Sequence, residues 1–261
     1  MLIHFYKYQG AGNDFVLIDN RDHRYDSIKN KEKITFLCHR RFGIGADGVM
    51  MIENKDGFDF EMIYYNSDGN PGSMCGNGGR CIVSLAHKLG MVESTASFNA
   101  SDGPHLAKIV QESYIELKMS DVTTIDLYDD HAELNTGSPH YIKRVSNIAH
   151  YPVYDEGRSI RYSASFPNGI NVNFISKAQD GYDIRTYERG VEDETWACGT
   201  GATAAALAIV EEERIYDKQE LKLRAKGGSL KVKFKRNQPG DFSDIWLCGE
   251  ATYVYEGDFN L

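Results

Sequence analysis

The chain has 261 residues, of which 41% are hydrophobic and 26% are charged, and its net charge is −9. This length predicts one or two domains with room for substantial hydrophobic cores. The acidic balance argues against a general binder of nucleic acid or anionic membranes. No apolar run approaches the roughly 20 residues that span a bilayer, and the first residues lack a signal-peptide pattern. A cytoplasmic protein is therefore expected.

In the first half, alternating apolar residues predict strands and apolar residues at helical spacing predict two helices. The first helix is expected over residues 28–41, and the second ends near Gly90, which suits a C-terminal cap. The expected strands cover residues 2–8, 15–19, 49–53, 58–65 and parts of 96–119.

The second half repeats this mixture. An alanine-rich helix is expected to end near Arg214, and a hairpin is expected around Gly227 and Gly228. The expected strands cover residues 131–135, 141–146, 171–177, 182–187, 221–225, 230–235 and 245–256.

Five cysteines are spread along the chain, at positions 38, 75, 81, 198 and 248. An odd, sparse set without a C-x-x-C pair indicates neither a disulfide framework nor a structural zinc site, so no metal is expected. For Cys38, Cys81 and Cys248 the ordinary interpretation is a buried, small hydrophobic residue.

Cys75 and Cys198 differ from the others because each is followed by Gly-x-Gly and then by an apolar helix. Residues 74–81 are Met-Cys-Gly-Asn-Gly-Gly-Arg-Cys, and residues 197–202 are Ala-Cys-Gly-Thr-Gly-Ala. Each cysteine is thus predicted at a helix N-terminus, where unpaired N–H groups and the helix dipole attract anions and lower a thiol pKa.

The two halves follow one pattern of strands, a cysteine turn, an apolar helix and further strands. Helices that are apolar on most sides are usually wrapped by other structure. The sequence therefore predicts an α+β fold with two pseudo-symmetric domains. Each is a curved, barrel-like antiparallel or mixed sheet around a central helix, with the active site in the cleft between them. The predicted domains are residues 1–119 with about 250–261, carrying Cys75, and residues 120–249, carrying Cys198.

A thiolate and a thiol on opposite faces of an α-carbon would suit stereoinversion. One sulfur removes the α-proton, the other delivers a proton to the far face, and backbone N–H groups at the two turns hold the substrate carboxylate. A single base returns the proton to the face from which it came. The pair would titrate as one coupled unit.

Five motifs, in this order, resemble the diaminopimelate epimerase family over nearly the whole chain. They are Gly10-Ala11-Gly12-Asn13-Asp14-Phe15, Asn66-x-Asp68-Gly69, Cys75-Gly76-Asn77-Gly78-Gly79-Arg80, Tyr187-Glu188-Arg189-Gly190 and Ala197-Cys198-Gly199-Thr200-Gly201-Ala202. The resemblance implies an isomerase that interconverts LL- and meso-diaminopimelate without a cofactor. It also implies a role in lysine and peptidoglycan-precursor biosynthesis, and a homodimer.

Carried over by position, the resemblance makes Cys75 and Cys198 the acid/base thiols, with His140 and Glu188 setting their surroundings. The implied substrate-binding residues are Asn13, Asn66, Gly76, Asn77, Asn171, Glu188, Arg189, Gly199 and Thr200. Two positions depart from the family pattern: Ser138 stands where asparagine is common, and Gly48 stands where some members have glutamine.

Two other motifs have simpler interpretations. Residues 43–48 match G-x-G-x-x-G, but a strand-like run follows instead of a helix, which argues against a dinucleotide site. The basic run 218–236 alternates with apolar residues and predicts a solvated strand face. Two alternatives remain: a two-cysteine racemase of proline, hydroxyproline or histidine, and a redox-sensing protein without catalysis. Arg189 with Asn66 and Asn171 favours a long substrate with a distal carboxylate.

Overall fold

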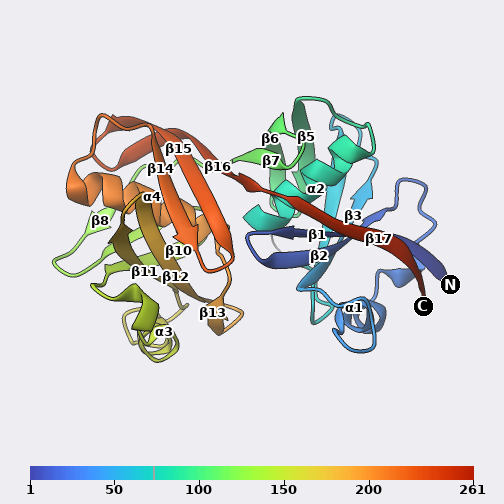
Figure 1. The fold of residues 1–261 in the computed structure, drawn as a ribbon, viewed down its shortest axis with the longest axis horizontal. Coiled ribbons are helices and arrows are strands. Elements are labelled where there is room, and N and C mark those ends of the chain that lie inside the picture. Colours follow the sequence, from blue (N-terminus) through green and yellow to red (C-terminus); the bar gives the residue numbers. More distant parts are fainter. Residues whose placement is uncertain (73) are drawn as a thin grey trace. The chain divides into compact units, whose positions relative to one another are not determined.

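The computed structural model describes residues 1–72 and 74–261, which divide into two compact units. Unit 1 comprises Met1–Leu117 and Gly249–Leu261, and unit 2 comprises Lys118–Cys248. Each unit combines a mixed sheet with a few helices (Figure 1), so the predicted α+β class is confirmed. Over the described residues the sheet stays open, so the word barrel-like applies to its curvature and not to closure.

Unit 1 is built on a sheet in which antiparallel hairpins alternate with parallel crossovers. Strand β1 lies between β17 and β2, β2 pairs with β3 in parallel, β3 and β4 are antiparallel, and β4 pairs with β5 in parallel. The strands are β1 (Leu2–Gly10), β2 (Asn13–Asp19), β3 (Gly48–Glu53), β4 (Phe60–Asn66), β5 (Thr95–Ala100), β6 (Gly103–Gln111), β7 (Tyr114–Lys118) and β17 (Thr252–Asn260). The helices are η1 (Asp26–Ile28), α1 (Lys31–Cys38) and α2 (Gly76–Lys88).

Unit 2 repeats the same alternation. Strands β9 and β10 are antiparallel, β10 pairs with β11 in parallel, β11 and β12 are antiparallel, and β12 pairs with β14 in parallel. The strands are β8 (Asp126–Leu127), β9 (Ala132–Asn135), β10 (Pro139–Arg144), β11 (Asn171–Ala178), β12 (Gly181–Glu188), β13 (Asp193–Thr195), β14 (Glu220–Ala225), β15 (Gly228–Gln238) and β16 (Asp241–Glu250). The helices are η2 (Ile148–His150), α3 (Val153–Arg161) and α4 (Gly199–Glu213).

The internal repeat is therefore visible in the topology. In each unit an antiparallel strand pair leads through a short helix to a parallel neighbour, then through a hairpin to the central helix. The central helices α2 and α4 are buried along most of their length. A helix buried on all sides needs apolar or small residues on every face, which is the pattern that their sequences show.

The sequence did not predict the short elements β8, β13, η1 and η2, and two α-helices also differ from the prediction. The helix expected over 28–41 is shorter, because Asn30 caps α1 through its side chain, which accepts the Lys33 N–H, and the helix ends at Cys38. Helix α3 was not expected, because its sequence is mostly polar and only Val153 and Gly157 are buried. No helix of the described residues is long and apolar enough to cross a membrane.

Candidate active site

Cys75 and Cys198 occupy the same place in the two units, namely the N-cap of the central helix. Their backbone angles nearly coincide, with φ −111° and ψ 120° at Cys75 and φ −112° and ψ 116° at Cys198. In each case the cysteine carbonyl accepts the N–H four residues on, from Gly79 at 2.7 Å and from Ala202 at 2.9 Å. Each helix therefore begins directly after its cysteine. The unpaired N–H groups of its first turn lie at the same helix end as the thiol.

The glycines of the two turns pack closely against side chains of the sheet. A Cβ atom on Gly78 would overlap the methyl group of Met50, and one on Gly201 would overlap Oδ1 of Asn173. Both glycines lie inside the first helical turn, where the helix rests on the sheet. They allow the close approach of helix and strand, in addition to leaving the N–H groups of the turn accessible.

In unit 1 the Cys75 thiol contacts the side chain of Asn13, at the start of β2. The Sγ atom lies 3.6 Å from Asn13 Oδ1. The amide of Asn13 is held from its other end, because its Nδ2 donates to Asp47 Oδ2 at 2.6 Å. Asp47 in turn accepts from the Asp14 backbone N–H at 3.1 Å and from Arg40 Nη2 at 2.8 Å. Asp47 was not among the predicted site residues.

Arg80 is a second residue of this turn that the sequence did not assign. Its side chain is fully buried, and it donates to the Gly76 carbonyl at 3.1 Å and to Asn77 Oδ1 at 3.0 Å. In α4 the residue at the same offset from its cysteine is Thr203, whose hydroxyl donates to the Gly199 carbonyl at 3.0 Å. Both helices thus satisfy the carbonyl of their first residue with a side chain.

Gly48 and Asn66 lie opposite each other at one end of the β3–β4 pair. A Cβ atom on Gly48 would lie 2.6 Å from Cε2 of Tyr64, so the Tyr64 ring fills the space that a glutamine would need at this position. Asn66 is exposed at the end of β4. Its position leaves the amide accessible to a ligand.

In unit 2 a buried polar network fixes the ring of His140. Asn173 Nδ2 lies 3.1 Å from His140 Nδ1 and 3.1 Å from the Tyr141 carbonyl, while Asn173 Oδ1 accepts from the Thr186 hydroxyl at 2.9 Å. Because the carbonyl and hydroxyl partners define the amide orientation, Nδ1 of His140 must accept, and the proton lies on Nε2.

His140 is neutral in this environment. Burial, together with the positive charge of Arg189, lowers the pKa of His140 to about 3. Its Nε2 atom is buried and has no hydrogen-bond partner among the residues that the structure describes. A buried N–H donor left in this way is costly unless a ligand or reacting group accepts from it.

A second cluster in unit 2 joins Ser138, Asn171 and Arg189. The Ser138 hydroxyl oxygen accepts from Asn171 Nδ2 at 2.8 Å and from Arg189 Nη2 at 3.4 Å. Asn171 Oδ1 accepts the backbone N–H of Arg189 at 2.9 Å. The Asn171 amide also donates to the Pro139 carbonyl at 3.1 Å, so both of its N–H groups are used. Serine at position 138 thus organises an amide and a guanidinium, of which the guanidinium can donate further hydrogen bonds to a carboxylate.

The remaining predicted residues of unit 2 lie at the ends of the same elements. Cys198 is 8% exposed, and its Sγ lies 3.4 Å from the hydroxyl of Thr200 in the first turn of α4. Glu188 ends β12, and the next residue along the chain is Arg189. In unit 2 the contacts thus join Ser138, Asn171 and Arg189 in one group and Cys198 and Thr200 in another.

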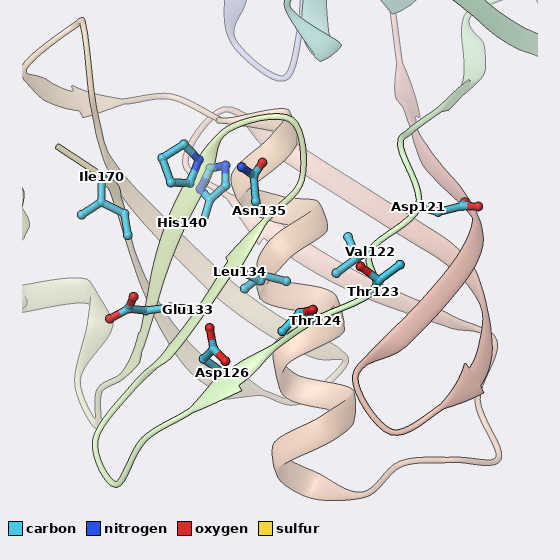
Figure 2. A pocket seen from close by; sticks show the side chains of 11 residues that line it. Asp121, Val122, Thr123, Thr124, Asp126, Glu133, Leu134, Asn135, His140 and Ile170 are labelled. Atoms are coloured by element: carbon cyan, nitrogen blue, oxygen red, sulfur yellow. The ribbon is translucent and has the colours of Figure 1, made fainter. Parts of the chain in front are cut away.

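A hollow of about 380 Å³ lies beside this cluster within unit 2 (Figure 2). His140 and Asn135 lie at one end of it, and the carboxylates of Asp126 and Glu133 lie at the other. Its lining includes neither Cys198 nor any cationic side chain. An acidic hollow of this kind is a poor place for a carboxylate.

The other cysteines are structural. Cys38, Cys81 and Cys248 are buried, and burial raises the pKa of the Cys38 and Cys81 thiols to about 12. Thiols of this kind stay protonated and unreactive near neutral pH. The sequence-based assignment of Cys38 and Cys81 as buried residues agrees with this environment.

The fold is shared with several solved structures, some of which are described as racemases or epimerases. A phenazine biosynthesis protein of the PhzF family from Bacillus anthracis matches with a TM-score of 0.78 and 15% identity, covering 100% of both chains. A probable proline racemase from Agrobacterium radiobacter matches with a TM-score of 0.70 and 15% identity, covering 99% of this chain and 92% of the other. At these identities the likeness concerns the fold alone.

Sequence relatives define the family. The profile of the diaminopimelate epimerase family matches residues 5–125 and 133–254. Diaminopimelate epimerases from Flavobacterium psychrophilum and Chlorobaculum tepidum are 45% and 41% identical to this chain, covering 96% and 97% of it and 98% and 99% of their own lengths. The chain belongs to the diaminopimelate epimerase family and is an isomerase.

Proposed function

We propose that this protein interconverts LL- and meso-diaminopimelate by a two-thiol mechanism that needs no cofactor, with Cys75 and Cys198 as its acid and base. The observation that carries the proposal is the pair of cysteine N-caps with nearly the same backbone angles, in a chain of this family. Two equivalent thiols at two helix N-termini suit a reaction that treats the two faces of a carbon alike.

The proton balance is simple. One thiolate takes the α-proton and becomes a thiol, the electron pair is delocalised into the carboxylate, and the other thiol donates its proton to the opposite face. The first-turn N–H groups of α2 and α4, from Gly76–Asn77 and Gly199–Thr200, are suited to holding that carboxylate as its charge increases. The mechanism requires that both sulfurs reach the same α-carbon.

His140 acts in this proposal as a neutral hydrogen-bond donor. Its Nδ1 accepts from Asn173, and a ring with a pKa of about 3 carries no charge near neutral pH. The Nε2–H is therefore available to stabilise an anion, either a thiolate or the reacting carboxylate. A general-base role for His140 does not fit this arrangement, because Nδ1, the nitrogen that could accept a proton, already accepts from Asn173.

Recognition of the distal end of the substrate is assigned to Asn66, Asn171, Glu188 and Arg189, whereas Asn13 would contact the substrate beside Cys75. Ser138 supports two of them, since its hydroxyl accepts from both Asn171 and Arg189. Amides that donate and accept, with one guanidinium and one carboxylate, match a zwitterionic amino-acid group.

The same proposal includes a cytoplasmic homodimer that acts in lysine and peptidoglycan-precursor biosynthesis. It rests on membership of the family.

The direct test is proton exchange. The reduced protein is incubated with LL-diaminopimelate in D₂O, and ¹H NMR follows loss of the α-proton while chiral chromatography follows formation of the meso isomer. Proline and histidine are incubated in parallel. Exchange and inversion of diaminopimelate alone are expected.

Absence of exchange into diaminopimelate under reducing conditions would overturn the proposal. Inversion of proline or histidine in its place would assign the chain to the alternative class of two-cysteine racemase. An oxidised sample serves as the control, because oxidation of either catalytic thiol should stop exchange that a reductant restores.

A further inference from the structure

Asp47 lies at the end of a hydrogen-bonded chain that reaches the Cys75 thiol through Asn13. We infer that Asp47 is a positioning residue that orients the Asn13 amide and thereby holds Cys75 as the protonated thiol in the resting enzyme. The inference deepens the proposed function, since it rests on Cys75 as one of the two acid/base groups. It assigns the resting acid to unit 1.

The first step is the orientation of the Asn13 amide. One end of the amide lies 2.6 Å from a carboxylate oxygen of Asp47, and only the NH₂ group can donate there. The same Asp47 oxygen also accepts the Asp14 N–H, and Arg40 holds the other oxygen at 2.8 Å. Flipping the amide would set its carbonyl oxygen against the carboxylate. The amide is therefore fixed in one orientation.

The second step is what the fixed amide presents to Cys75. Its Oδ1 lies 3.6 Å from Sγ, within range of a hydrogen bond from a thiol. A carbonyl oxygen accepts an S–H but offers nothing to a thiolate, whose lone pairs would face those of the oxygen. A hydrogen bond to the neutral form of an acid favours that form. This contact therefore stabilises the Cys75 thiol over the thiolate.

The third step is the contrast with Cys198. Its Sγ lies 3.4 Å from the Thr200 hydroxyl, which can rotate and donate its proton to sulfur. A hydroxyl therefore tolerates either protonation state, whereas the Asn13 carbonyl favours one. If the two thiols together have lost one proton, the negative charge should then lie on Cys198.

Other charged groups surround the Cys75 turn and enter the test. Asp14 is ion-paired with Lys7 and with Arg40 at 2.6 Å each, and Arg80 is buried on α2 itself. Cys81, also on α2, has a pKa raised to about 12 by burial, so it remains neutral. A change at Asp47 alters charge as well as hydrogen bonding, so the two effects must be separated.

Two matched variants make that separation. Asp47→Ala removes both the carboxylate charge and the acceptor that orients Asn13. Asp47→Asn removes the charge but keeps an oxygen for the Asn13 Nδ2–H, and the largely exposed Arg40 side chain can move away from the new amide. Circular dichroism verifies that each variant is folded.

The experiment measures iodoacetamide alkylation of the reduced enzyme against pH, with mass spectrometry of the Cys75 and Cys198 peptides. The wild-type midpoint is expected at higher pH for Cys75 than for Cys198. Asp47→Ala should lower the Cys75 midpoint by about one pH unit, or roughly tenfold more thiolate, which matches loss of one hydrogen bond to the thiol. Asp47→Asn should leave it near the wild-type value, and Asn13→Ala should lower it as Asp47→Ala does.

Equal midpoint shifts in the Ala and Asn variants would show that charge alone acts, and would overturn the positioning role. A wild-type midpoint lower for Cys75 than for Cys198 would overturn the assignment of the resting acid. The measurement needs no turnover, so it remains readable if the protein fails to invert diaminopimelate.

Discussion

The two cysteine turns share a backbone and differ in what surrounds the sulfur. Both cysteines cap a central helix with φ and ψ within about four degrees of each other, and both helices satisfy their first carbonyl with a side chain. Yet Cys75 faces an amide carbonyl, and Cys198 faces a hydroxyl. The repeat therefore supplies two equal positions for a thiol, and the neighbouring side chains make them chemically unequal.

The layer beneath each turn shows the same divergence. Gly78 packs over Met50, which pairs with Tyr64, whereas Gly201 packs over Asn173, which pairs with Thr186. The support is apolar in unit 1 and polar in unit 2. The polar support in unit 2 can hold a neutral imidazole in one tautomer, and His140 occupies that place. In unit 1 the side chains of Asn13 and Asp47 lie next to the cysteine turn instead.

The largest effect is expected when one of the two catalytic cysteines is removed. Cys75→Ala and Cys198→Ala should each reduce the rate of inversion at least about 10³-fold, because each removes one of two obligatory proton-transfer groups. The measurement is the rate of meso-diaminopimelate formation. Cys38→Ala, at a buried thiol, is the matched control and should retain turnover. Near-wild-type inversion by either of the first two variants would refute the two-thiol mechanism.

A second prediction tests the polar network around His140 in unit 2. It concerns the pH dependence of stability. The fold lowers the pKa of His140 to about 3, against an ordinary value of 6.5 in the unfolded chain. The unfolded state thus binds more protons between these values, so this contribution is complete above pH 6.5 and is lost as the pH falls toward 3.

Compared with His140→Gln, the wild type should lose roughly 3 kcal/mol of unfolding free energy between about pH 7 and pH 4. Urea denaturation at a series of pH values measures the difference between the two proteins. Glutamine keeps an N–H donor but cannot titrate in this range. Parallel pH profiles for the two proteins would contradict a neutral, buried His140.

A third effect concerns the glycines on which both turns rest, and it includes the smallest change expected. Gly201→Ala should cost about 3 kcal/mol of unfolding free energy, because the new methyl group meets a hydrogen-bonded amide that cannot move. Gly78→Ala should cost about 1 kcal/mol or less, since the end of the Met50 side chain can rotate away and alanine favours a helix. Urea denaturation of both variants checks this ranking, and equal costs would contradict the proposed difference in packing.

Much of the fold could be predicted because its signals are local. Strand alternation, the Gly227–Gly228 hairpin and the two apolar helices depend on neighbouring residues, and each has a counterpart in the structure. Helix α3 was missed because its mostly polar sequence gives little periodic signal, although Gly157 packs tightly against Tyr187. Such contacts depend on a distant strand, which no local pattern reports.

The sequence by itself determined the two cysteine turns and the family to which the chain belongs, because these are encoded in short, contiguous motifs. Only the tertiary structure revealed the links from Asp47 to Asn13 and from Asn173 to His140, which join residues 34 and 33 positions apart. Sheet register brings these side chains together, and hydrogen-bond direction then decides which atom donates. The backbone repeat thus sets where the two thiols lie, and the long-range contacts set how each thiol differs.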